Sequence, residues 1–319
     1  MDIPPIANLA FELSSYAIAI VIFAKVARED RFQIFLFLTA IVATVSAELI
    51  GIRVSHGYYY TDFLIKIAGR PDGLPLCIAL DWAVIIFCVW RLGARLDVKW
   101  YLLPLVFGAL AVPLDLVLDP VASISKLVPH AFMDCHAGNF PPGEAIGLSY
   151  WVWCVSPANA HHWFGVPLGN FIGWFLLVAG FTLCALIAQR KLGHDASWPR
   201  IVLAGIGVVV GTLLLEFGSL WIFEQLEKLG ISSAILLTGL LATGFGAILA
   251  SGNRRTDRSF DVWSMTAFLG TLTCCTLAYF GSLRAVASQD FVFAMSSVLA
   301  VSVALSFWVM RGWPVSRSK

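Results

Sequence analysis

The sequence has few charged residues: Asp, Glu, Lys and Arg make up only 13% of its 319 positions, whereas 59% are hydrophobic. An ordinary soluble domain carries about 25% charged residues, so this composition excludes that class of protein. The net charge of +1 is too small for the basic surface that binds nucleic acids, so no nucleic-acid partner is expected. No internal repeat and no separate polar domain is visible. We therefore expect a single integral membrane domain over residues 1–319.

Paired cysteine motifs are also missing. None of the seven cysteines belongs to a Cys-x-x-Cys pair, and most lie in apolar runs, so we expect small buried hydrophobic residues. The first apolar run lacks both a preceding basic segment and a following small-residue cleavage site. It is therefore expected to remain as a helix and not to act as a cleaved signal peptide.

Long apolar runs dominate what is present. Runs of about 20 residues can cross a bilayer as helices. They fall at residues 6–26, 32–52, 73–92, 100–118, 164–188, 200–223, 231–251, 262–282 and 289–310. We predict an all-α polytopic membrane protein with about nine transmembrane helices, eight being the alternative count, and with two long structured outer loops.

The basic residues are distributed unevenly between the two sides of the predicted bundle. With nine spans, fifteen of the 21 Lys and Arg residues fall on the side of the C-terminus and six on the side of the N-terminus. Cytoplasmic loops are enriched in Lys and Arg. We therefore expect an inner membrane of the bacterial type, with the N-terminus outside and the C-terminus in the cytoplasm.

The two long outer loops cover residues 53–72 and 119–163. The first mixes aromatic, apolar and basic residues, which suits a segment lying in the membrane interface. The second is rich in Pro, Gly, Trp and His, too polar to span and too aromatic for a free linker. Backbone of this kind must fold against protein, because lipid cannot satisfy its amides.

Ionisable groups inside the spans are costly and are therefore candidate functional residues. Glu48 and Asp81 lie in the second and third spans, and Asp115 and Asp119 end the fourth. Asp115 and Asp119 are spaced i, i+4, which puts them on one helix face. Asn170 opens the fifth span. All five residues are expected at the outer membrane face, so separate stretches of sequence converge on one candidate site.

Structural interpretations of the same acids remain open. Asp119 precedes a proline and could end its helix, Asp81 could form an interhelical hydrogen bond, and Glu48 could pair with Arg53. Glu216 and Glu224, in the sixth span, are weaker candidates.

Aromatic residues crowd around the same acids. Trp and Tyr at an interface are commonly membrane anchors. Their rings also stabilise cations, by about 2 kcal/mol or more in a desolvated pocket. The residues concerned are Tyr58, Tyr59, Tyr60, Trp82, Tyr150, Trp151, Trp153, Trp163 and Trp174. Acids beside aromatic faces suit the protonation of an alkene through a carbocation.

Four histidines in the second outer loop raise a metal-site alternative. They are His130, His136, His161 and His162. Membrane di-iron hydroxylases carry several histidine boxes, including an HxxHH pattern that is absent here. His136, His161 and His162 are therefore ambiguous: they could hydrogen-bond the acids or anchor the loop.

Several blocks of the sequence resemble a known family. They read ELIG followed by HGYYY, then LPL…W, DLVLDP, YWVW and FGVPLGNFIGW. In this order they are similar to the integral-membrane carotenoid biosynthesis family, whose characterised members are carotenoid 1,2-hydratases acting on γ-carotene and bisanhydrobacterioruberin. The resemblance covers residues 40–180, whereas residues 190–319 carry additional spans without a recognised motif.

The resemblance implies addition of water across the C1=C2 bond of an acyclic carotenoid end. On the hypothesis drawn from the residues, Asp115 and Asp119 share the proton that attacks C2, and Glu48 or Asp81 activates the water that captures the cation. Asn170 and Tyr60 would hold this water. The residues expected to bind substrate are Tyr58, Tyr60, Trp82, Trp151, Trp153, Trp163, Asn170 and Trp174.

This scheme needs no cofactor and no metal. The expected partners are a lipophilic carotenoid, such as lycopene, and the bilayer, with association with other membrane enzymes of the pathway as a further expectation. Two other classes stay open: a metal-dependent lipid hydroxylase or desaturase, and a non-catalytic isoprenoid binder or transporter.

Overall fold

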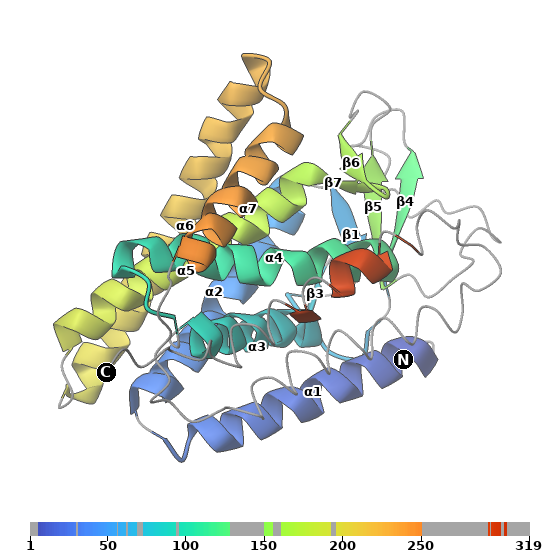
Figure 1. Cartoon of the computed structure of the whole chain (residues 1–319). Coiled ribbons are helices and arrows are strands. Elements are labelled where there is room, and N and C mark those ends of the chain that lie inside the picture. The colour runs from blue at the N-terminus through green and yellow to red at the C-terminus, as the bar shows by residue number, and fades with distance from the viewer. Residues whose placement is uncertain are drawn as a thin grey trace.

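The computed structural model describes residues 6–29, 31–55, 57–61, 63–68, 73–93, 96–127, 150–155, 161–192 and 196–250, with a few residues between 293 and 304. This part of the chain is mostly helical (Figure 1). Its long helices are α1 (Ile6–Val26), α2 (Arg31–Ser55), α3 (Leu76–Gly93), α4 (Leu103–Ala122), α5 (Leu168–Leu192), α6 (Trp198–Lys228) and α7 (Ser233–Ala250).

These seven helices confirm the first seven predicted spans. Each is long and apolar enough to cross a membrane, which suggests a membrane protein. The predicted span at 262–282 lies outside the described residues, and of the span at 289–310 the structure describes a few helical residues, such as 295–300. The count of nine therefore stays a prediction.

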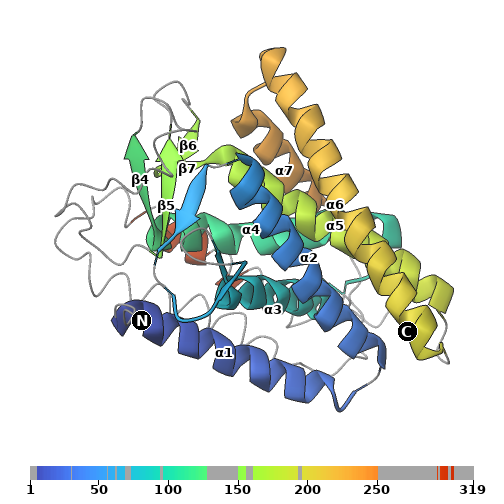
Figure 2. The ribbon, with the colours of Figure 1, turned by 180° about the vertical axis from the view of Figure 1, so that it is seen from behind.

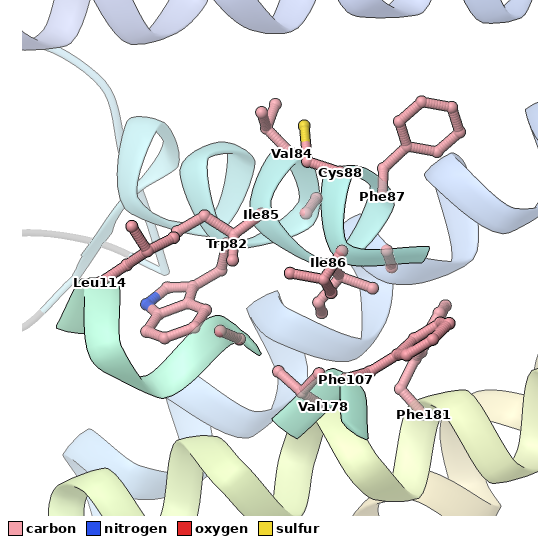
Figure 3. Packing of buried hydrophobic residues seen from close by; sticks show 14 of the residues in the cluster. Trp82, Val84, Ile85, Ile86, Phe87, Cys88, Phe107, Leu114, Val178 and Phe181 are labelled. Atoms are coloured by element: carbon pink, nitrogen blue, oxygen red, sulfur yellow. The ribbon is translucent and has the colours of Figure 1, made fainter. Parts of the chain in front are cut away.

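The centre of the bundle is formed by α3 and α4. Within their most apolar windows, 83% of the residues of α3 and 72% of those of α4 are buried, against 22% in α6 and α7. Figure 3 shows Ile86 of α3 pointing toward Phe107 of α4 and Val178 of α5. From behind, α2 lies between α3 and the pair formed by α5 and α6 (Figure 2). Polar groups on α3 and α4 are consequently shielded from the surroundings.

Short strands in the two long outer loops correct the all-α expectation. Strand β1 (Tyr58–Tyr60) pairs antiparallel with β5 (Trp151–Val155), which pairs parallel with β4 (Ser123–Leu127). This three-stranded sheet lies at the end of the bundle where α4 ends and α5 begins (Figure 1). Thus the first outer loop is tied to the second, about 90 residues later.

Two further strand pairs complete the outer loops. Strand β2 (Lys66–Ile67) pairs with β3 (Leu74–Pro75), and β6 (His162–Trp163) pairs with β7 (Val166–Pro167). The buried Glu12 of α1 accepts hydrogen bonds from the backbone N–H groups of Leu64 and Ile65. The first outer loop is therefore fastened to α1, a contact that the sequence did not indicate.

Candidate functional site

One face of the three-stranded sheet carries four of the predicted aromatic residues. In the β1–β5 register, Tyr58 lies opposite Trp153 and Tyr60 opposite Trp151. Alternate residues of a strand point to the same face, so all four rings share one side. The ring centroids of Tyr58 and Trp153 are 4.7 Å apart, and those of Tyr60 and Trp151 are 5.8 Å apart. The sheet thus forms an aromatic roof over the ends of α2 and α4.

Three N–H groups donate hydrogen bonds to Asp119 of α4. The indole N–H groups of Trp151 and Trp153 donate to Oδ1, at 2.6 and 2.9 Å, and the Asn170 amide donates to Oδ2 at 2.6 Å. The same Asn170 nitrogen lies 3.2 Å from Oδ2 of Asp115, one turn earlier. Both carboxylates are 3% exposed. The first turn of α5 therefore links the two acids.

Glu48, near the end of α2, is buried and accepts a hydrogen bond of 2.5 Å from the Tyr58 hydroxyl. Tyr60 also interacts with this carboxylate. Burial raises the pKa of the Tyr58 and Tyr60 hydroxyls above its ordinary value, and the neighbouring Glu48 raises it further. Both hydroxyls therefore keep their protons. Arg53 is exposed, so the structure gives no support to its pairing with Glu48.

Asp81 of α3 is buried, and one oxygen, Oδ2, accepts a hydrogen bond of 2.8 Å from the Ser15 hydroxyl of α1. The other oxygen, Oδ1, has no hydrogen-bond partner in the described part of the chain. The next residue, Trp82, stacks on Trp174 of α5 with an angle of 9° between the rings. Asp81 thus does form an interhelical hydrogen bond, while half of its carboxylate remains unsatisfied.

A small cavity, here called the inner chamber, lies between these groups and has a volume of about 30 Å³. That is room for about two water molecules. Its lining consists of Phe11, Glu48, Tyr58, Tyr60, Ile78, Asp81, Trp82, Ile85, Asp115, Leu118, Asp119, Trp151, Trp153, Asn170 and Trp174. The four predicted acids and seven of the eight predicted substrate-binding residues are therefore brought together.

A larger cavity of about 360 Å³, the outer chamber, adjoins it between α2, α5 and α6. It is lined by Ala47, Glu48, Gly51, Gly57, Tyr58, Trp153, Cys154, Pro167, Gly169, Asn170, Gly173, Trp174, Glu216, Phe217 and Leu220. Glu48, Tyr58, Trp153, Asn170 and Trp174 line both chambers. No Lys, Arg or His occurs among the described residues that line either chamber. The ligand-sized outer chamber and the water-sized inner chamber thus share a wall that includes Glu48.

The remaining predicted residues lie elsewhere or outside the described chain. Trp163 lines neither chamber; its indole N–H donates to the backbone carbonyl of Leu116, at 2.8 Å. Pro120 has no N–H to offer this carbonyl, so Trp163 takes the place of a helix hydrogen bond. His161 and His162 are exposed and line neither chamber. His130 and His136 lie outside the described residues, and within the described part no three His, Cys, Asp or Glu side chains could hold a metal ion.

Three contributors to the site were missed or underrated. Phe11 and Ser15 of α1 carry no sequence signal, because neutral and hydroxyl residues are common in spans. Glu216 is a weaker candidate by its sequence position, yet it lines the outer chamber. The alternation Tyr-x-Tyr and Trp-x-Trp is a strand signal that could have predicted the sheet.

Cys154 of β5 differs from the cysteine expectation, because it is disulfide-bonded, whereas Cys77 and Cys88 are buried, as expected. Chemically, the arrangement offers several buried acids, water-sized space and aromatic faces, with an adjoining cavity for an apolar group.

Comparison of the chain with protein-family models, with characterised proteins and with solved structures finds no match.

Proposed function

We propose that the protein is an integral membrane carotenoid 1,2-hydratase, which adds water across the terminal C1=C2 bond of an acyclic carotenoid by acid catalysis. The observation that carries this proposal is the junction of the two chambers. A water-sized space among four acids adjoins a larger, mainly apolar space, and aromatic rings belong to the wall that the two share. Hydration of an alkene needs these parts: an acid, a water and a surface that tolerates a cation.

The hydrogen bonds favour Asp115 as the proton donor. Asp119 accepts from three N–H groups, an environment that stabilises a carboxylate. Among the described residues, Asp115 receives the longer contact from Asn170 alone. With Asp119 ionised, the proton of the pair resides on Asp115. This division of roles is more specific than the shared proton expected from spacing alone.

The cation would form at C1 when Asp115 transfers its proton to C2. Stacked Trp82 and Trp174 and the roof residues Tyr58 and Trp153 supply ring faces nearby. A face in good geometry stabilises a desolvated cation by about 2 kcal/mol. The tertiary cation is therefore formed in a cavity whose walls carry negative potential.

Water in the inner chamber would complete the reaction. Its oxygen adds to C1, and Glu48, which lines both chambers, accepts the proton that the water loses. One proton and one hydroxyl group have then been added, and the proton on Glu48 must return to Asp115 before the next turnover. Asn170 and Tyr60 are suited to orient the water, since both line the same space.

The membrane assignment and its orientation belong to the same proposal. The seven apolar helices support a membrane protein. The proposed bacterial-type inner membrane, with the N-terminus outside and the C-terminus in the cytoplasm, rests on the distribution of Lys and Arg. The disulfide at Cys154 supports this orientation, because disulfides persist in oxidising compartments and β5 lies in a proposed outer loop.

The proposal is tested by expressing the full chain in a lycopene-producing bacterium and analysing the pigments. We expect products heavier by one or two waters. In heavy water, deuterium should appear at C2, and the new hydroxyl oxygen should come from labelled water. If the oxygen came from O₂, the hydratase assignment would be wrong and an oxygenase would take its place.

A further inference from the structure

Glu216 lies well inside α6, on a helix beyond the region of family resemblance, and is only 7% exposed. Its carboxylate lines the outer chamber, and Oε2 has no hydrogen-bond partner among the described residues. A buried polar atom without a partner costs free energy. An unsatisfied carboxylate oxygen at a cavity wall is therefore a position at which a ligand can bind.

The outer chamber has acidic side chains in its wall. Glu48 and Glu216 both line it, and its described lining contains no Lys, Arg or His. The rings of Tyr58, Trp153 and Trp174 add electron-rich faces. Phe217, Leu220 and Pro167 make the remaining wall apolar. These features together select a ligand with a positive charge and a hydrocarbon body.

Two glycines create the space for such a ligand. Gly169 and Gly173 lie one turn apart on α5 and line the chamber. A Cβ atom at Gly169 would meet nothing within 4 Å, and one at Gly173 would meet only Leu220, at 3.9 Å. Larger side chains at these positions would thus project into the chamber without disturbing the backbone.

We propose that the outer chamber binds lipophilic quaternary ammonium ions, with the cationic nitrogen between Glu216 and Glu48 and the hydrocarbon chain toward the membrane. The choice of ligand rests on the proposed function. A trimethylammonium group on an isoprenoid chain has the shape and charge of the tertiary cation that protonation of the carotenoid end produces. Mimics of a high-energy intermediate bind more tightly than the substrate itself.

The test compares two ligands on the purified full-length protein in detergent micelles, with quenching of tryptophan fluorescence as the readout. One ligand is geranyltrimethylammonium, and the other is the same chain ending in a neutral tert-butyl group. Since the pair differ only in charge, we expect the ammonium ion to bind at least about tenfold more tightly. Equal affinities would overturn the proposal without the use of any variant.

Matched variants locate the site. Glu216→Gln should weaken ammonium binding about tenfold, a loss of one charge contact, and leave the neutral ligand unaffected. Glu224→Gln is the control on the same helix, because Glu224 is exposed and paired with Lys228. Gly173→Leu should block both ligands, whereas Gly207→Leu, at an exposed glycine of α6 that lines neither chamber, should block neither. Ammonium binding that is unchanged in both Glu216→Gln and Gly173→Leu would place the site elsewhere and refute the proposal.

The outcome is separable from that of the proposed function. Selective ammonium binding by a protein that never hydrates lycopene would uphold this inference and refute the hydratase. Hydration of lycopene by a protein with no preference for the ammonium ligand would uphold the hydratase and refute this inference.

Discussion

Asp115 and Asp119 are the same kind of residue, one helical turn apart, yet their surroundings differ. Two indoles and an amide donate to Asp119, while within the described part of the chain Asp115 has one such contact, from Asn170. The sequence could predict that both residues belong to one site, because acids within apolar spans are rare. Which of the two carboxyl groups holds the proton could not be predicted, because the answer depends on side chains from β5 and α5.

The division of roles predicts different consequences for the same substitution. Asp115→Asn should lower the hydration rate by about 10²–10⁴-fold, the usual contribution of general acid catalysis, with little change in thermal stability. Asp119→Asn should lower both the hydration rate and the thermal stability, because the new amide must then face the amide of Asn170. Rates from pigment analysis and melting of the purified variants check this. A double variant should be little slower than the slower single one, since the pair acts as a unit. Near-normal hydration by Asp115→Asn would remove it as the donor.

At the scale of elements, the spans were predictable and the outer loops were not. A span is a local property: each apolar run of α1 to α7 is visible within its own window. The sheet is non-local, because β1 pairs with β5 across about 90 residues. The contribution of α1, through Ser15 to Asp81 and Glu12 to the loop, depends on the packing of helices and was invisible for the same reason.

Close helix packing gives a prediction for α7. A Cβ atom at Gly244 would overlap with Ala109 and with the Leu105 carbonyl of α4, whereas one at Gly246 would meet nothing within 4 Å. Small residues allow helices to approach closely in membranes. Gly244→Ala should therefore destabilise the protein by about 1–3 kcal/mol, the usual cost of overpacking.

Gly246→Ala is the control from the same helix, and it should be neutral or slightly stabilising, because Ala is the better helix former. Thermal unfolding in one detergent measures both variants. If the two variants melted at the same temperature, α7 would not pack on α4 through Gly244.

At the scale of the molecule, the elements of the site meet at one end of the bundle. The start of α1, the end of α2, the start of α3, the end of α4 and the start of α5 lie on this side with the sheet (Figure 1). The charge distribution could predict that these ends share a side. Glu216 of α6 joins them although the sequence marks it only as a weaker candidate, because its place depends on how α6 packs against α2 and α5.

This arrangement predicts which membrane side carries Cys154. A thiol reagent that cannot cross membranes, added to the outer face, should label Cys154 only after a reductant has opened its disulfide. A reporter fused after Lys319 should be active only in the cytoplasm. Labelling of Cys154 from the cytoplasmic face alone, or reporter activity outside, would reverse the orientation.

Helix α6 has 31 residues, a length of about 46 Å at 1.5 Å per residue, whereas the hydrocarbon core of a bilayer is about 30 Å thick. In a bilayer, tilt of the helix and placement of its charged last turns, Glu224 to Lys228, among the lipid headgroups would take up the surplus. Tilt responds to bilayer thickness, and a change in the tilt of α6 would change the distance between Glu216 and Glu48 on α2. The acyl-chain length of the surrounding lipids should therefore set the width of the outer chamber, so that membrane composition adjusts the site from outside the protein.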